Sequence, residues 1–248
     1  MILLFDIGNT HTHLGLGDAR RVVKQGDIPT FAWMAGGAPG RVKAFVGSAN
    51  IAGAAVCSVV PRATPIAKKF VQTAWKLDAL ELTADTIRGV GIDYPKPNSI
   101  GPDRLANAVA ARRRFGAPVV VVDFGTAVTF DVVDARGSYV GGIIAPGLAM
   151  MTNYLHEKTA LLPKIQIREV RSAIGKSTQE AMLVGAVHGY RGLVRELIGK
   201  LKRELGAEKL PVVATGGYAK LIAARLPEIT AVAPDLTLEG LRLVWNAK

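Results

Sequence analysis

Two stretches of the chain share one pattern of apolar and polar positions. Residues 1–20 begin with an apolar run that ends at Asp6, then Gly8, a polar turn and a second run of mixed character. Residues 118–136 repeat this order, with VVVV leading into Asp123 and another glycine turn. A repeat of this kind predicts two related structural units.

Each repeat continues into a further possible strand, at 20–28 in the first copy and at 138–146 in the second. Strands joined by short turns predict an antiparallel meander in each half. Between and after the meanders, helical spacing predicts helices at 103–115 and 178–205, with a capping box from Ser177 to Glu180. Short buried strands are expected in VCSVV and LPVVA.

The alternation of strands and helices predicts an α/β fold. We expect two similar halves, residues 1–116 and 117–248, each built from a strand meander plus helices. No linker rich in Gly, Ser or Pro separates them. A central cleft between such halves is the expected place for a ligand.

Composition places the chain among globular proteins, because 49% of its 248 residues are hydrophobic. No apolar run is long enough to span a bilayer, and Asp6 interrupts the start too early for a secretory signal. We therefore expect a cytoplasmic protein without a membrane partner. The single cysteine, Cys57, lies in an apolar run and is predicted to be a core residue.

The net charge of +11 raises the question of a polyanionic partner. The densest basic cluster, Arg112 to Arg114, follows an alanine-rich helical stretch and precedes Gly116. Cations there complement the helix dipole, and glycine ends the helix. The charges therefore predict a solvated helix end, and nucleic acid is not the expected partner.

The acidic turns after the two apolar runs carry the candidate chemistry. An aspartate at the end of a buried strand can bind magnesium, while glycine lets backbone N–H groups face a phosphate. One such turn alone is more typical of ordinary turn chemistry. Two copies in matched settings favour a nucleotide triphosphate held from both sides.

Five motifs in order along the chain resemble those of type III pantothenate kinases. They are DIGNT at 6–10, GPDR at 101–104, DFGTAVT at 123–129, GGIIAPG at 141–147 and GKSTQEAM at 175–182. That family belongs to the superfamily of acetate and sugar kinases, hsp70 and actin, whose members have two ribonuclease-H-like halves. The resemblance covers essentially the whole chain, and it agrees with the repeat.

The resemblance implies ATP-dependent phosphorylation of pantothenate to 4′-phosphopantothenate, the first step of coenzyme A synthesis. It also implies Mg²⁺, a monovalent cation such as K⁺ or NH₄⁺, and a homodimer. By resemblance, Asp103 is the catalytic base and Asp123 the ligand of the monovalent cation. The implied ATP contacts are Asp6, Ile7, Gly8, Asn9, Thr10, His11, Thr12, His13 and Thr126. The implied pantothenate contacts are Tyr94, Gly101, Pro102, Asp103, Arg104 and Thr178.

Several of these residues also have a plain structural interpretation. Asp103 could cap the helix that follows it, and Arg104 could form a surface salt bridge. Tyr94 could cover a core edge, and Thr178 could share helix capping with Ser177.

The two histidines at 11 and 13 share one face of a strand and could suggest a metal site. With no further His or Cys nearby in sequence, they are predicted to be ordinary strand residues rather than metal ligands.

Two alternative functions remain open from the sequence. One is a transcription-linked accessory protein without enzymatic activity. The family also resembles such a factor, and the positive net charge of this chain would suit that role. The other is a kinase of the same superfamily that acts on a different hydroxyl acceptor.

Overall fold

A computed structural model describes all residues from Met1 to Lys248. The chain forms two compact units. The first comprises Met1–Gly116, Gly137–Val140 and Asp235–Lys248, and the second comprises Ala117–Arg136 and Gly141–Pro234. The chain thus passes into the second unit after Gly116, and its C-terminal segment belongs to the first.

The first unit is built on a five-stranded sheet in the order β3-β2-β1-β4-β5. These strands are β1 (Ile2–Ile7), β2 (His11–Gly17), β3 (Val22–Pro29), β4 (Gly53–Ser58) and β5 (Leu80–Glu81). β1, β2 and β3 form the predicted antiparallel meander, while β4 pairs parallel to β1. β1 and β4 are almost fully buried, as their apolar sequences predict.

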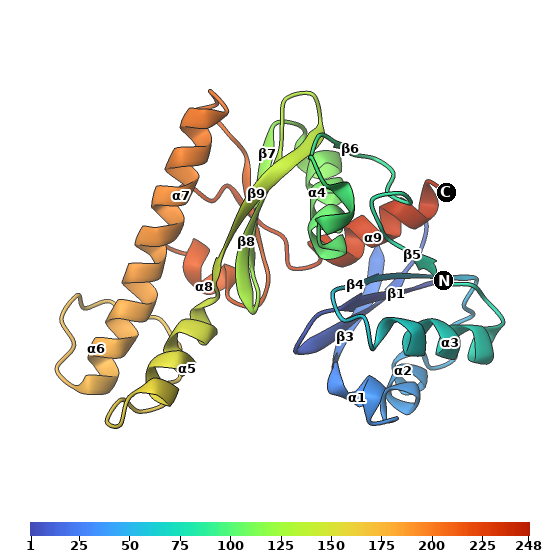
Figure 1. The fold of residues 1–248 in the computed structure, drawn as a ribbon, viewed down its shortest axis with the longest axis horizontal. Coiled ribbons are helices and arrows are strands. Elements are labelled where there is room, and N and C mark those ends of the chain that lie inside the picture. The colour runs from blue at the N-terminus through green and yellow to red at the C-terminus, as the bar shows by residue number, and fades with distance from the viewer. The chain divides into compact units, whose positions relative to one another are not determined.

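Helices cover both faces of this sheet (Figure 1). The helices of one face are α1 (Phe31–Met34), α2 (Ala38–Val46) and α3 (Thr64–Trp75), and those of the other are α4 (Pro102–Phe115) and α9 (Leu236–Asn246). Phe5, Trp33 and Val71 belong to the apolar core under α1 to α3. On the opposite face Gly53 leaves room for Trp245 of α9, because a Cβ there would meet the indole ring at 2.2 Å.

The remaining elements of the first unit are short. They are a 3₁₀ turn, η1 (Pro97–Ser99), and the strand β6 (Gly91–Ile92). β6 pairs with Ser138 and Tyr139, which are the first residues of β9 (Ser138–Pro146). This pairing brings Tyr139 into the first unit.

The second unit repeats the meander. Its strands are β7 (Val119–Phe124), β8 (Ala127–Val133), most of β9, β10 (Val212–Thr215) and β11 (Ala231–Val232). β7 pairs antiparallel with β8 and parallel with β10. β1 and β7 show the same succession of burial along their six residues, with a half-buried aspartate at the fifth position of each. The duplication seen in the sequence is therefore a duplication of structure.

The helices of the second unit are α5 (Leu148–Lys158), α6 (Thr178–Val184), α7 (Tyr190–Glu204) and α8 (Ala219–Ala223). A π-helical turn, η2 (Gly185–Gly189), joins α6 to α7, so the helix predicted over 178–205 is continuous but not α-helical throughout (Figure 1). Tyr190 packs beside Phe124, with ring centroids 6.3 Å apart. This contact fixes α7 to the meander of its own unit.

Two predictions about helix ends are tested directly. α4 ends with Arg112, Arg113 and Arg114 before Gly116, as predicted. Ser177 caps α6 by accepting a hydrogen bond from the Glu180 N–H, but the Glu180 carboxylate accepts from the Lys176 N–H rather than from Ser177. The capping box therefore has its expected bond to the Ser177 hydroxyl, but the Glu180 side chain bonds to the residue before the N-cap.

None of the helices combines the length and the apolar character that crossing a membrane requires.

Candidate active site

The turn between β1 and β2 presents the first candidate phosphate site. It spans Gly8, Asn9 and Thr10, and the Gly8 N–H closes it by donating to the His11 carbonyl at 3.0 Å. A side chain at Gly8 would approach that carbonyl to 3.1 Å. Asn9 and Thr10 are exposed, so they lie at the protein surface at the end of a buried strand.

A row of polar side chains crosses the sheet beside this turn. In the strand register Asp6 lies opposite His13 and also opposite Cys57, and His13 lies opposite Asp27. Residues directly opposite one another project from the same face of a sheet. His13 Nδ1 lies 2.6 Å from Asp27 Oδ1, and Cys57 Sγ lies 3.5 Å from Asp6 Oδ1.

The predicted base, Asp103, lies in the first turn of α4. Gly101 is the N-cap of that helix and Pro102 its first residue, so Asp103 is not the cap that the plain interpretation suggested. Its Oδ1 accepts a hydrogen bond from the Arg104 N–H at 2.9 Å. Burial raises the pKa of the Asp103 carboxyl above its ordinary value, although the Arg104 N–H and guanidinium act in the opposite direction.

Cys57 connects these two acids. Burial raises the pKa of its thiol well above the ordinary value, and the negative charges of Asp6 and Asp103 raise it further. The Asp6 carboxylate contacts this thiol, and α4, which carries Asp103, packs against β4, which carries Cys57. The structure thus brings together two aspartates that are far apart in sequence.

Two of the residues predicted to contact pantothenate, Tyr94 and Arg104, lie against Tyr139. The Tyr94 and Tyr139 rings meet edge to face with centroids 6.1 Å apart. The Arg104 guanidinium lies 5.7 Å from the Tyr139 ring centre. A Cβ at Gly101 would come within 2.5 Å of Asp103 Oδ1, so glycine lets the chain pass close to that carboxylate. Sequence reasoning missed Tyr139, because its motif lies in the opposite half of the chain.

The second unit holds the matching acidic turn. Asp123 lies near the end of β7, and Thr126 is exposed in the turn that leads to β8. Two glycines pack against this turn. A Cβ at Gly147 would meet the Thr126 carbonyl at 2.0 Å, and a Cβ at Gly216 would meet Asp123 Oδ1 at 2.5 Å. Gly216 also has a φ of +87°, which favours glycine.

Thr178 lies in the second unit as the first residue of α6. It is exposed, and the cap of the helix comes from the Ser177 hydroxyl. The hydroxyl of Thr178 is therefore not needed for capping.

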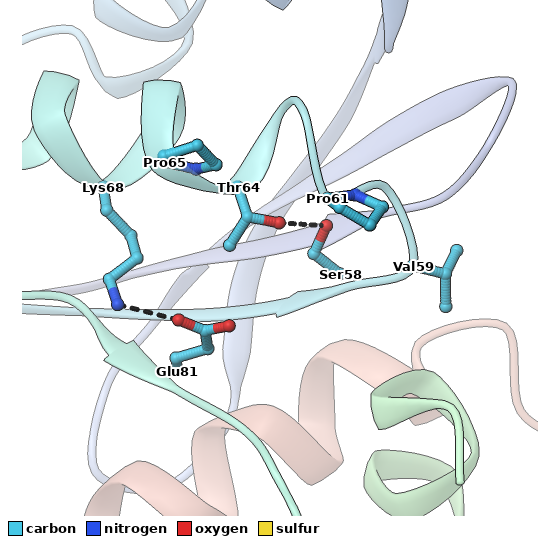
Figure 2. Close-up of a pocket in the computed structure, with 7 residues that line it drawn as sticks. All are labelled: Ser58, Val59, Pro61, Thr64, Pro65, Lys68 and Glu81. Carbon is cyan, nitrogen blue, oxygen red and sulfur yellow. Dashed lines mark hydrogen bonds and ion pairs between the residues drawn. The ribbon is translucent and has the colours of Figure 1, made fainter. Parts of the chain in front are cut away.

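The pocket drawn in Figure 2 contains none of the predicted site residues. It has a volume of about 590 Å³ and is lined by Ser58, Val59, Pro61, Thr64, Pro65, Lys68 and Glu81. Lys68 and Glu81 form an ion pair across it at 2.7 Å. It lies beside α3, whereas Asp6 and Cys57 project from the opposite face of the sheet. The pocket is therefore separate from the cluster of aspartates.

No group of three or more His, Cys, Asp or Glu side chains is arranged to hold a metal ion. The rings of His11 and His13 have centroids 6.5 Å apart, and they form no such group. A full protein cage is not expected for Mg²⁺ in a nucleotide site, where one or two carboxylates act together with phosphates and water. The Asp6 carboxylate, near the end of a buried strand, fits that mode of binding.

Comparison of the amino-acid sequence with known proteins points to one family. Residues 2–200 match the family model of type III pantothenate kinase. The type III pantothenate kinase of Methylacidiphilum infernorum is 45% identical over 98% of this chain and 87% of its own length. That of Akkermansia muciniphila is 46% identical over 97% of this chain and 96% of its own length.

Solved structures with low sequence identity share the fold. A putative Baf family transcriptional activator from Campylobacter jejuni aligns over 99% of this chain and 98% of its own, with a TM-score of 0.63 and 19% identity. A putative 2-dehydro-3-deoxygalactonokinase from Sinorhizobium meliloti covers 100% of this chain and 96% of its own, with a TM-score of 0.61 and 15% identity. These likenesses establish the architecture of two similar α/β domains.

Proposed function

Because the chain belongs to the type III pantothenate kinase family, it is an ATP-dependent pantothenate kinase, and we propose how its residues divide that work. The reaction transfers the γ-phosphate of ATP to the pantothenate hydroxyl at the start of coenzyme A synthesis. One observation carries the assignment of residues. The Cys57 thiol bonds to the Asp6 carboxylate, and α4, which carries Asp103 in its first turn, packs against β4, the strand of Cys57, so the phosphate-binding turn and the candidate base belong to neighbouring elements of the first unit.

Asp103 is the proposed catalytic base. It accepts the proton of the pantothenate hydroxyl while the hydroxyl oxygen attacks the γ-phosphate. The raised pKa of its carboxyl supports this role, since a more basic carboxylate is a better proton acceptor. The alternative that Asp103 serves only to cap α4 is disfavoured, because Gly101 is the N-cap of that helix.

ATP is proposed to bind through the segment from Asp6 to His13 and through Thr126. The Asp6 carboxylate and the phosphates are both negatively charged, so Asp6 would act through the divalent ion. That ion would neutralise phosphate charge when bound. The backbone N–H groups of the turn and the exposed side chains of Thr10, His11 and His13 supply donors. Thr12 is fully buried, so its contribution is to support the turn from behind.

Asp123 is the proposed ligand of the monovalent cation. Oxygen atoms suit K⁺ or NH₄⁺, and this corner offers the Asp123 carboxylate near the carbonyl groups of the Gly125–Thr126 turn. The close approach of Gly216 to Asp123 Oδ1 supports a carboxylate held in one place.

Pantothenate is proposed to contact Tyr94, the segment Gly101–Arg104 and Thr178. The Arg104 guanidinium would bind the pantothenate carboxylate, for which its planar fork is well shaped. Its position over the Tyr139 ring supports a fixed orientation. Pro102 keeps the start of α4 rigid beside the base.

A homodimer in the cytoplasm completes the proposal. Exposed apolar side chains gather on α5, namely Met150, Met151, Tyr154 and Leu155. Apolar side chains grouped on a surface mark interaction sites. Sedimentation analysis of the wild type and of Tyr154→Asp tests the dimer, which the charged variant should weaken.

A kinase assay with single omissions tests the function. Product formation should require ATP, pantothenate and Mg²⁺, and it should rise when K⁺ or NH₄⁺ replaces Na⁺. A panel of other hydroxyl acids should remain unphosphorylated. Tight, salt-sensitive DNA binding with no turnover would instead favour a role like that named for the Campylobacter jejuni protein.

A further inference from the structure

Thr30 occupies an unusual position directly after β3. It is the N-cap of α1, where a threonine oxygen ordinarily accepts a hydrogen bond from the first turn of the helix. Here the side chain makes no capping bond. Its hydroxyl instead donates to the Gly8 carbonyl at 2.7 Å, and its backbone N–H donates to the Thr10 carbonyl at 3.0 Å. Thr30 therefore binds both ends of the turn between β1 and β2.

A chain of buried hydrogen bonds lies behind Thr30. The Trp33 indole N–H donates to Thr12 Oγ1 at 3.2 Å, and Thr12 Oγ1 lies 3.1 Å from Thr30 Oγ1. Each hydroxyl has one proton, and an indole can only donate. Since the Thr30 proton is used on the Gly8 carbonyl, Thr12 must donate to Thr30. The direction is thus fixed from Trp33 through Thr12 and Thr30 to Gly8.

The bond to Gly8 also orients the next amide. In a trans peptide the C=O and the following N–H point in opposite directions. A Gly8 carbonyl turned toward the buried Thr30 hydroxyl therefore directs the Asn9 N–H away from the core. An N–H directed outward from a turn is a donor for an anionic oxygen.

We propose that Thr30 is a positioning residue for the phosphates of ATP, acting through the orientation of the Gly8–Asn9 peptide. The inference rests on the proposed role of the Asp6–His13 segment in ATP binding. It extends that role to a residue outside every motif of the sequence. The network from Trp33 to Gly8 is complete only while the Thr30 hydroxyl is present.

Thr30→Val tests the proposal, because valine keeps the shape and removes the hydroxyl. We expect the Kd for ATP, measured by calorimetry without pantothenate, to rise about tenfold, which is the loss of roughly one charge-assisted hydrogen bond. The KM for pantothenate should stay within about twofold in the same variant, in keeping with an effect confined to ATP. Thr30→Ser restores the hydroxyl and should return the Kd for ATP toward the wild-type value.

Thr64→Val is the matched control. Thr64 is also a nearly buried threonine at the start of a helix in the first unit, and its hydroxyl bonds to Ser58 Oγ at 2.8 Å. Thr30→Val and Thr64→Val each lose one such hydrogen bond and should both lose thermal stability, but Thr64→Val should keep the wild-type ATP affinity. Should Thr30→Val fail to fold, Trp33→Phe removes the far donor of the network and keeps an aromatic ring against Phe5. That variant should show a smaller rise in the Kd for ATP.

A folded Thr30→Val protein with wild-type ATP affinity would overturn the proposal. So would equal losses of affinity for ATP and pantothenate, since those would report general destabilisation. If Trp33→Phe serves in its place, wild-type ATP affinity in that variant counts against the proposal in the same way. A wild-type protein that binds ATP but does not phosphorylate pantothenate would remove the proposed function and leave this inference to be judged by the Kd values alone.

Discussion

Cys57 lies fully buried beside Asp6, and its thiol donates a hydrogen bond to Asp6 Oδ1 at 3.5 Å. The parallel pairing of β1 with β4 places the two residues opposite each other. The contact ties the carboxylate at the end of one central strand to its neighbour. Asp6 is thus held on two sides, by the sheet and by the thiol.

The thiol of Cys57 should be unreactive in the native protein. Thiolate is the reacting form, and burial together with the negative charges of Asp6 and Asp103 raises the pKa of this thiol. We expect labelling by a thiol reagent at pH 7 to be at least on the order of 100-fold slower than in the urea-unfolded chain. Rapid stoichiometric labelling of the folded protein would show that the site around Asp6 is open.

Asp103→Asn should separate activity from stability. Loss of the base should lower kcat by on the order of 10² to 10⁴. Since the folded-state pKa of Asp103 is raised, its ionised form costs stability, and this cost sets in as pH rises through the folded pKa. The variant should therefore unfold at the same or a higher temperature at pH 7.

The control for this variant is Asp85→Asn, an exposed aspartate in a loop of the same unit. It should keep wild-type kcat and stability. Near-normal turnover of Asp103→Asn would remove Asp103 from the mechanism. A kcat/KM that stays flat as pH falls through the raised pKa of the Asp103 carboxyl would do the same.

Gly216 and Gly217 form a matched pair for testing the proposed cation site at Asp123. A Cβ at Gly216 would meet Asp123 Oδ1 and the Phe124 backbone, at a φ of +87°, while a Cβ at Gly217 would meet nothing within 4 Å. Gly216→Ala should therefore displace Asp123 and raise the K⁺ or NH₄⁺ concentration for half-maximal activation by about tenfold or more. Gly217→Ala should leave it unchanged. Equal activation curves for the two variants would contradict Asp123 as the cation ligand.

Glu169 and Arg191 form the best-defined ion pair of the second unit. Arg191 is 4% exposed and donates to both carboxylate oxygens, at 3.0 and 2.7 Å. These bonds and the positive charges of Arg191 and Arg225 lower the pKa of Glu169. Because Glu169 is 37% exposed, solvent weakens the pair, and we expect Glu169→Gln to cost about 1–2 kcal/mol of unfolding free energy at pH 7.

The pH dependence has a definite sign. A lowered pKa means that the pair stabilises the fold above the ordinary glutamate pKa of 4.5 and loses this effect as pH falls through the folded-state value. Denaturation curves of wild type and Glu169→Gln should therefore converge in acid. Glu196→Gln, from the exposed pair with Lys200, is the control and should change stability by less than about 0.5 kcal/mol. A constant difference across pH would exclude this assignment.

The duplicated meander could be predicted from sequence because strand periodicity and turn residues are local signals. Both copies have the predicted strands, and both place an aspartate at the same position. Helices α1 to α3 were not predicted. α1 has only four residues, and Gly37, Pro39 and Gly40 interrupt the apolar pattern where α2 begins. Packing against β1 and β4, rather than local propensity, stabilises them.

The acidic residues of the candidate site could be predicted from the sequence, but the residues that hold them in place could not. Asp6 and Asp123 repeat in sequence, so the pattern reveals them. Cys57 meets Asp6 only through the register of β4, and Thr30 meets Gly8 only once β3 has folded back along β2. Contacts of this kind depend on the pairing of strands, and the local sequence around each residue does not indicate its partner.

We propose that each half of the chain contributes one acidic turn to a single ATP-dependent reaction. The most direct test of this is the initial rate of 4′-phosphopantothenate formation by wild type, Asp6→Asn and Asp123→Asn at saturating pantothenate, with Asp85→Asn alongside. We predict a loss of on the order of 10²-fold for each turn variant, a magnitude typical of removing charge stabilisation during phosphoryl transfer. Wild-type rates in a folded Asp6→Asn or Asp123→Asn protein would contradict the account.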